Sequence, residues 1–372
     1  MNGPTERSVS SVCSVGTKQE VKMTKKIILF VLLSFSICLM GESIRPVLDD
    51  VGFCWQKEQV NRLLDHLKSL ETEKVEMPQL IAGISPHDDY LYAGRIYYPL
   101  FSRVKTREVV IFGVTHGTVR KRIGDPREKL IFDEYEYWTG PFGNVSISGL
   151  REFLKGKLDK NYILVDNVAH QWEHSIEAEI PFLQYFNRDI KITPIMVTGM
   201  DFDTMERLSE MLATQIVEYI KANNLELGKD IFFLISADAN HYGKDFDNLF
   251  FGEGLAAHQK GTEHDKEIAE ACLSGSMTVD KIRDLTQRLW GKTYADYKDT
   301  YWCGKYSIPF GMLTVLKTVE KVKAGKELNG KILRYSDTYT EGVLPLKKPG
   351  YGITAPFSLK HWVGFFSAGF YL

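Results

Sequence analysis

The stretch LIAGISPHDDYLYAG, residues 80–94, decides the fold of this chain. It begins as a short apolar run, which is typical of a strand that is buried on both faces of a sheet. Directly after the run, His87, Asp88 and Asp89 bring ionisable side chains to the end of the predicted strand. Because ligands of open α/β sheets bind beyond the carboxyl ends of the strands, this order predicts a functional site at that edge.

Further apolar runs repeat the pattern along the chain, at residues 108–116, 192–199 and 230–243. Stretches with helical spacing of apolar residues separate them, at residues 60–71, 150–158, 205–223 and 308–323. Strands that alternate with helices predict an α/β fold, with a largely parallel central sheet flanked by helices. The length of 372 residues permits two domains, but no linker or change of composition marks a boundary, so we expect one.

Histidines and carboxylates follow several of these runs. His87, His116, Asp238 and His241 each come shortly after the end of a predicted strand. One such histidine is more often a hydrogen-bonded surface residue than a ligand. Several in the same topological position favour one shared crevice at the carboxyl edge of the sheet.

The composition argues against several classes of function. A formal net charge of -2 gives no reason to expect a nucleic-acid partner. The five cysteines form no C-x-x-C pair, so neither a zinc ribbon nor a disulfide scaffold is indicated. The sequence also lacks the glycine-rich dinucleotide motif, the P-loop and the G-x-S-x-G motif of α/β-hydrolases.

The segment HQWEH, residues 170–174, formally matches the H-x-x-E-H motif of inverzincin proteases. That chemistry requires both histidines on one face of a helix. Here the pattern of the preceding residues predicts a strand and a loop, and a helix that starts only near Ser175. We therefore expect the match to be accidental, and we expect His170 to tolerate alanine with metal content and stability nearly unchanged.

Cys303 lies in a glycine-flanked loop that opens a helix. The field at a helix N-terminus lowers the pKa of a thiol, which favours a nucleophile or a thiolate metal ligand. The alternative is an inert, half-buried cysteine.

The first part of the chain, residues 1–42, is interpreted as a disordered leader followed by a signal peptide-like segment that starts at Met23. Two lysines precede an apolar stretch, residues 27–40, that is short for a membrane-spanning helix. We therefore expect residues 43–372 to be exported to the periplasm or the extracellular space. Cys38 raises the alternative of a lipid anchor, although Ile37 before it is poorly suited to lipoprotein cleavage.

Several segments together resemble the MEMO family, also described as protein B of the AmmeMemoRadiSam system. SPHDDYLYAG resembles the family's P-H-A-G-Y-x-Y motif, IFGVTH resembles its strand ending in G-P-S/T-H, and EHSIEAEIPF resembles its E-H-S-x-E helix. ISADANHYG and WCGKYSIPFG are similar to two later family segments. The matches lie in family order across most of residues 53–372.

The resemblance implies a fold like that of class III extradiol dioxygenases, with a metal site made of two histidines and a cysteine. On this sequence these metal ligands are His87, His116 and Cys303. The resemblance also places further pocket residues, to which we assign catalytic roles: Glu173, His174, Asp238 and His241. Imidazole and thiolate ligands suit one ion of Fe(II) or Cu, with zinc less expected. A cysteine in place of the carboxylate of extradiol enzymes argues against ring cleavage.

The chain departs from the family pattern at Asp88 and Asp89, where relatives have Ala-Gly. Consecutive residues of an extended segment point to opposite sides, so we expect at most one of the two to face the metal crevice. Alternatively, both cap the following turn and face solvent. Smaller departures are Val114, Lys305 and Ser307, at positions where the family has proline, arginine and proline.

Together these features predict an exported MEMO-like protein with a mononuclear metal site, acting as a metal-dependent redox enzyme related to oxygenases. One alternative is a non-catalytic protein that binds a small molecule or peptide in the same crevice; another is a cysteine–histidine hydrolase. Because AmmeMemoRadiSam proteins are expected to work beside cytoplasmic radical-SAM proteins, an exported copy predicts no stable complex with such a partner.

Overall fold

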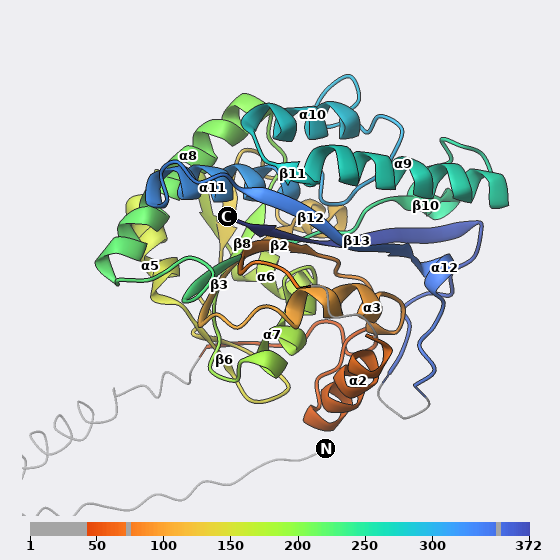
Figure 1. The fold of residues 1–372 in the computed structure, drawn as a ribbon, viewed down its shortest axis with the longest axis horizontal. Coiled ribbons are helices and arrows are strands. Elements are labelled where there is room, and N and C mark those ends of the chain that lie inside the picture. Colours follow the sequence, from red (N-terminus) through yellow and green to blue (C-terminus); the bar gives the residue numbers. More distant parts are fainter. Residues whose placement is uncertain (1–42, 72–75, 347–350) are drawn as a thin grey trace, which may run out of the picture. The chain divides into compact units, whose positions relative to one another are not determined.

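The computed structural model describes residues 43–71, 76–346 and 351–372. One β-sheet forms its central layer (Figure 1). The centre of this sheet is parallel. Its strands lie in the order β6 (Val145–Ile147), β8 (Lys191–Val197), β3 (Glu108–Val114), β9 (Ile231–Ser236) and β2 (Leu80–Ser85). The predicted α/β fold with a parallel central sheet is therefore confirmed.

Antiparallel strands extend the sheet beyond β2. There β2 pairs with β13 (His361–Tyr371), β13 with β12 (Asn329–Asp337), and β12 with β11 (Gly275–Ser276). The short strand β10 (His241–Gly243) also pairs with β13. This arrangement brings the C-terminal strand beside β2, far from it in sequence.

The opposite side of the sheet is built from short strands. β6 pairs with β5 (Tyr137–Trp138), which pairs with β1 (Ile44–Arg45). β4 (Leu130–Phe132) pairs with both β8 and β7 (Ile163–Val165). These strands of two or three residues carry too little periodicity for a pattern-based prediction.

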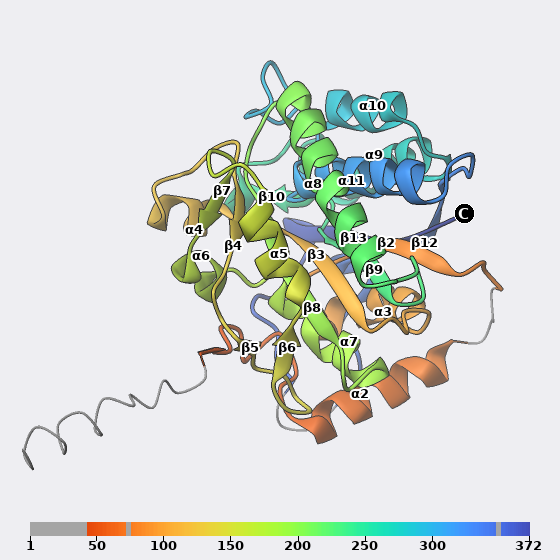
Figure 2. The ribbon, with the colours of Figure 1, turned by 90° about the vertical axis from the view of Figure 1, so that its left-hand side faces the viewer.

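Helices cover both faces of the sheet (Figures 1 and 2). One face packs against α5 (Gly149–Lys157), α8 (Phe202–Ala222), α9 (Leu255–Leu273), α10 (Val279–Leu289) and α11 (Ser307–Val322). The other face packs against α2 (Lys57–Leu70), α3 (Tyr90–Phe101) and α7 (Ile180–Phe186). The remaining short elements are α4 (Gly117–Arg122), α6 (Asn167–Trp172), α12 (Thr338–Glu341), and the 3-10 helices η1 (Glu177–Glu179) and η2 (Lys244–Phe246).

The two hydrophobic cores explain why the central strands are apolar throughout. Along β3, Val110 and Phe112 enter one core, whereas Val109 and Ile111 enter the other. Side chains of a strand alternate between faces, so a strand that is covered on both sides needs apolar residues at every position. Truncation of the fully buried Phe112 to alanine should cost about 3–5 kcal/mol of stability.

Parallel pairing brings the carboxyl ends of β2, β3 and β9 to one edge of the sheet. Ser85 at the end of β2 pairs in register with Ser236 at the end of β9. The residues that follow these strands therefore emerge side by side, as the sequence predicts.

By their contacts, Ser43–Leu372 form one compact unit. Within the described ranges, none of the helices combines the length and apolar character that crossing a bilayer requires. The predicted leader and signal peptide-like segment, residues 1–42, lie outside the described residues.

Candidate metal centre

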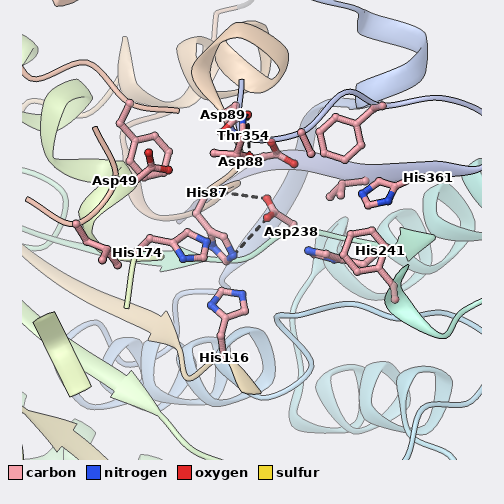
Figure 3. A pocket seen from close by; sticks show the side chains of 16 residues that line it. Asp49, His87, Asp88, Asp89, His116, His174, Asp238, His241, Thr354 and His361 are labelled. Carbon is pink, nitrogen blue, oxygen red and sulfur yellow. Dashed lines mark hydrogen bonds and ion pairs between the residues drawn. The ribbon is translucent and has the colours of Figure 1, made fainter. Parts of the chain in front are cut away.

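A cavity of about 580 Å³ opens where the central strands end (Figure 3). The histidines that line it are His87, His116, His174, His241 and His361. Its aspartates are Asp49, Asp88, Asp89 and Asp238. Such a concentration of ionisable groups in one concave site is the usual setting of a binding or active site.

His87, His116 and Cys303 converge beside this cavity. His87 follows β2, His116 follows β3, and Cys303 lies in the loop before α11. One potential ligand atom from each lies within 4.8 Å of the others, and Cys303 Sγ is 3.4 Å from His87 Nε2. The three residues predicted to bind a metal are thus brought together in the geometry of a possible site.

Ser236 fixes the tautomer of His87. Its hydroxyl donates to the carbonyl of Ser175 at 2.7 Å, so that its oxygen accepts from His87 Nδ1–H at 2.8 Å. The lone pair of His87 Nε2 then faces Cys303. Burial lowers the pKa of His87 well below its usual value, so the ring is neutral and able to bind a metal.

Glu173 holds His116 in the same way. Its carboxylate accepts from His116 Nδ1 at 2.7 Å, from His116 N at 2.9 Å and from Ser175 N at 3.0 Å. Burial raises the pKa of Glu173, but the His116 ring, the His174 ring and the N–H of His116 together outweigh burial and bring that pKa below its usual range. His116 Nε2 is left on the side away from Glu173, as in carboxylate–histidine pairs of metal sites.

Cys303 is buried, and its environment differs from the predicted one. Burial, together with the Asp238 carboxylate, raises the pKa of the thiol well above its usual value. The expected lowering by a helix N-terminus is wrong, because α11 begins only at Ser307 and the desolvation of Cys303 dominates. The stabilising contact is a hydrogen bond from Asp238 N to Cys303 Sγ, at 3.1 Å.

Asp238 and His241 occupy the next part of the wall. Asp238 Oδ1 accepts from His87 N at 2.9 Å, and Oδ2 lies 3.3 Å from His87 Nε2. Burial raises the pKa of Asp238 to about 7, whereas burial lowers the pKa of His241 to about 4. Potential ligand atoms of Asp238, His241 and Cys303 also lie within 4.8 Å of one another.

His174 completes the group of predicted catalytic residues. Its ring stacks on that of His116 with centroids 4.7 Å apart, and burial lowers its pKa to about 4. The structure therefore brings Glu173, His174, Asp238 and His241 around the triad, as the family resemblance implies.

Asp88 and Asp89 both border the cavity, contrary to the expectation that at most one would. The reason is that the backbone does not continue as a strand, because Asp89 is the N-cap of α3. Asp89 Oδ2 accepts from Thr354 N at 2.6 Å and from Thr354 Oγ1 at 3.1 Å, whereas Asp88 Oδ1 accepts from Asp89 N at 2.6 Å. Neither side chain is fully exposed to solvent.

His170 lies apart from the cavity lining. It sits on α6, not in the predicted strand and loop, and that helix ends at Trp172 before Glu173 and His174. Its Nε2 lies 3.0 Å from the carbonyl of Ile131, and its side chain is 1% exposed. The H-x-x-E-H residues thus do not share one helix. The burial of His170 leads us to expect that alanine there would lower stability, unlike the prediction from the sequence.

Arg45 is a structural support that the sequence reading missed. It forms a buried ion pair with Glu177 and donates to the carbonyls of His170 at 2.8 Å and Glu173 at 2.9 Å. It thereby ties the strand β1 to the segment that carries Glu173 and His174. The signal in the sequence was Glu177, the second glutamate of the segment that resembles the family's E-H-S-x-E helix, but the sequence did not indicate Arg45 as its partner.

Comparison with known proteins identifies similar chains. Residues 53–344, which contain the triad, match the family described as Memo-like protein. A MEMO1 family protein of Methanococcoides burtonii is 30% identical over 259 residues, which cover 69% of this chain and 79% of that protein. A MEMO1 family protein of Aquifex aeolicus is 32% identical over 189 residues, 50% of this chain and 62% of that protein. One from Methanosarcina mazei is 29% identical over 273 residues, 73% of this chain and 84% of that protein.

Proposed function

The chain belongs to the Memo-like protein family, and on this premise we propose that it binds one transition-metal ion, Fe(II) or Cu, through His87, His116 and Cys303. The observation that carries the proposal is the convergence of the three side chains, with ligand atoms within 4.8 Å of one another. Two imidazoles and a sulfur are a donor set that suits iron and copper better than harder ions.

The surroundings of the triad fit such an ion. Ser236 and Glu173 each occupy the Nδ1 side of one histidine, at 2.8 and 2.7 Å, which leaves both Nε2 atoms for a metal. Outer partners of this kind orient the ligands and raise their basicity. The N–H of Asp238 at 3.1 Å from Cys303 Sγ would stabilise a thiolate once a cation offsets its burial.

We propose a redox enzyme related to oxygenases, acting on a small molecule. A bound iron or copper ion would supply one-electron chemistry and open coordination positions. The residues of the chain would orient the substrate, exclude water and manage protons. Asp238 has a pKa raised to about 7 by burial, so its carboxyl group can both hold and release a proton near neutral pH. His241 is neutral because burial lowers its pKa, and it can accept a proton at Nε2, since Nδ1 lies 3.2 Å from the carbonyl of Ala239.

A contact between Cys303 and His87 supports a second candidate. The distance of 3.4 Å between Cys303 Sγ and His87 Nε2 also fits a thiol nucleophile with a histidine base. Metal analysis separates the two functions, because a hydrolase of this type needs both residues free of metal. Consumption of O₂ by the metal-loaded protein would distinguish a redox enzyme from a protein that only binds a ligand in the cavity.

The test is the metal content of protein prepared without oxygen. We expect one Fe or Cu ion per chain. Loss of a residue that hydrogen-bonds a metal ligand weakens metal binding by about 10–100-fold, and we expect Cys303→Ser, which removes a ligand itself, to weaken it more. Cys272→Ser, which alters another buried cysteine, in α9, is the matched control and should retain the metal. Full binding by a variant with alanine at all three ligand positions would overturn the proposal.

Export forms a separate proposal, motivated by the basic and apolar segment of residues 23–42. We propose that the mature chain works outside the cytoplasm and forms no stable complex with a radical-SAM partner. Cell fractionation with N-terminal sequencing of the recovered protein tests this. A cytosolic chain with an uncleaved N-terminus would contradict it.

A further inference from the structure

A second set of potential ligand atoms lies beside the triad and shares its cysteine. One atom each of Asp238, His241 and Cys303 lies within 4.8 Å of the others, and the same Cys303 Sγ is 3.4 Å from His87 Nε2. Figure 3 shows Asp238 between His87 and His241. The sulfur of Cys303 therefore lies where two sets of ligand atoms meet.

His241 is held in the same manner as the two histidines of the triad. It begins β10, where it pairs with Val363 of β13, and its Nδ1 lies 3.2 Å from the carbonyl of Ala239. Its Nε2 has no hydrogen-bond partner among the described residues. A histidine that binds a metal through one nitrogen normally donates the N–H of the other to a carbonyl or carboxylate, and His241 is placed to do so.

Acceptor atoms without a donor converge on the space next to Cys303. The Nδ1–H of His87 donates to Ser236, so His87 Nε2 carries a lone pair, and Asp238 Oδ2 lies 3.3 Å from that nitrogen. Acceptors that face one another at this distance require a proton or a metal ion between them. A metal ion bound by His87 would satisfy the Nε2 lone pair. Asp238 Oδ2 and His241 Nε2 would then remain as ligand atoms for a second ion.

A third set of potential ligand atoms has a different role. His116, Glu173 and His174 also lie within the same distance of one another. However, both carboxylate oxygens of Glu173 already accept hydrogen bonds, from His116 Nδ1, His116 N and Ser175 N. Glu173 therefore supports a metal ligand and is not itself one. Within the described residues no further set of three comes this close, so the set that shares Cys303 is the place for a second ion.

We propose that Asp238, His241 and Cys303 bind a second transition-metal ion, so that the thiolate of Cys303 bridges two ions. The inference rests on the proposed function, because the ion at His87, His116 and Cys303 is one half of the pair. One carboxylate oxygen, one imidazole nitrogen and one sulfur are ligands that suit Fe(II) or zinc. Because the two ions share one thiolate and repel each other, we expect the second ion to bind more weakly than the first. It would therefore be found when the metal is in excess.

The test counts the ions bound at equilibrium dialysis against excess Fe(II) in the absence of oxygen. We expect two ions per parent chain and one in His241→Ala. The matched control is His361→Ala, which removes another histidine of the cavity lining and should retain two. X-ray absorption of the loaded parent should show a second iron within about 4 Å of the first, and this signal should be absent from His241→Ala. Asp238→Asn, which keeps the shape of the side chain, should also hold one ion, and it replaces His241→Ala if that variant does not fold.

The outcomes separate this inference from the proposed function. A single ion in the parent that is retained by His241→Ala and lost in His116→Ala would overturn the second site and leave the triad in place. Two ions in His241→Ala or in Asp238→Asn would mean that the additional ion binds elsewhere, which also overturns the inference. Loss of all metal in His241→Ala would show that His241 serves one ion only. An absence of bound metal in the parent would refute both proposals.

Discussion

Two walls of one cavity depend on buried carboxylates in opposite electrostatic settings. Behind the first wall, to which His116 and His174 belong, Glu173 is 1% exposed and accepts hydrogen bonds from His116 Nδ1, His116 N and Ser175 N. The two histidine rings, His116 and His174, and the N–H of His116 together outweigh the effect of burial, and the pKa of Glu173 lies below its usual range. This carboxylate is therefore ionised over the whole working range of pH.

On the second wall, Asp238 is buried to the same degree but meets a different environment. Its single backbone donor is His87 N, and its carboxylate neighbours include Asp89. Burial raises the pKa of Asp238 to about 7. The comparison teaches that burial alone does not set the charge of a carboxylate; the number of donors and the sign of the neighbouring groups decide it.

Replacement of Glu173 by glutamine should have the largest effect on this comparison. A glutamine oxygen in place of Oε1 can still accept from His116 Nδ1 and Ser175 N, but the amide NH2 in place of Oε2 cannot accept from His116 N. The substitution also removes the charge that steadies His116. We expect metal affinity to fall by about 10–100-fold. Asp238→Asn keeps the acceptor for His87 N and should lower the affinity less. The measurement is competition for the metal against a chelator of known affinity.

A matched control for this prediction is Glu58→Gln, at an exposed position of α2, which should bind metal like the parent. Equal metal affinities for Glu173→Gln and the parent would show that the charge of Glu173 does not support metal binding by His116. The difference between the two carboxylates would then have no effect on the metal site.

The sequence was sufficient for the parts of this site that depend on topology. Long apolar runs identified the central strands, and parallel pairing then required His87 and His116 to meet at one edge. The supporting role of Ser236 was not readable, because a serine at a strand end becomes a histidine partner only through tertiary contacts. The predictions for Asp88–Asp89 and for Cys303 were wrong because each applied a rule that holds for an isolated segment. At Asp88–Asp89 the backbone turns into α3 instead of continuing as a strand, and at Cys303 burial raises the pKa of the thiol.

The pH dependence of stability should differ in sign between the two walls. Asp238 has a folded pKa of about 7, above its unfolded value near 4, so its contribution is full below pH 4 and is lost as the pH rises through 7. Glu173 has a lowered pKa, so its contribution is present above its unfolded value and is lost only in strong acid. Relative to the parent, metal-free Asp238→Asn should therefore gain stability between pH 5 and pH 8, whereas Glu173→Gln should not.

Thermal unfolding of the metal-free variants at pH 5 and pH 8 measures this difference. In a unit of this length each kcal/mol shifts Tm by about 1–2 °C, so a gain of a few degrees for Asp238→Asn is expected. Histidines such as His174 and His241, whose pKa values are lowered, also change stability with pH, but they are present in both variant and parent. The difference in Tm between variant and parent therefore cancels their contribution. Parallel profiles for the two variants would contradict the opposite settings of the walls.

The smallest effect on the metal site is expected from His170, which lies three residues before Glu173 but does not line the cavity. His170 packs with Trp138 at 5.9 Å between ring centroids and contacts the Ile131 carbonyl through Nε2. We expect His170→Ala to lower the free energy of unfolding by about 1–3 kcal/mol, since it removes a buried ring and a hydrogen bond.

The metal content of His170→Ala should equal that of the parent, whereas His174→Ala, which removes the ring stacked on His116, should change metal binding. Denaturant unfolding and metal analysis of the two variants test this pair. A zinc-dependent peptidase activity that disappears in His170→Ala, or a loss of metal without a loss of stability, would mean that the H-x-x-E-H segment takes part in the site after all.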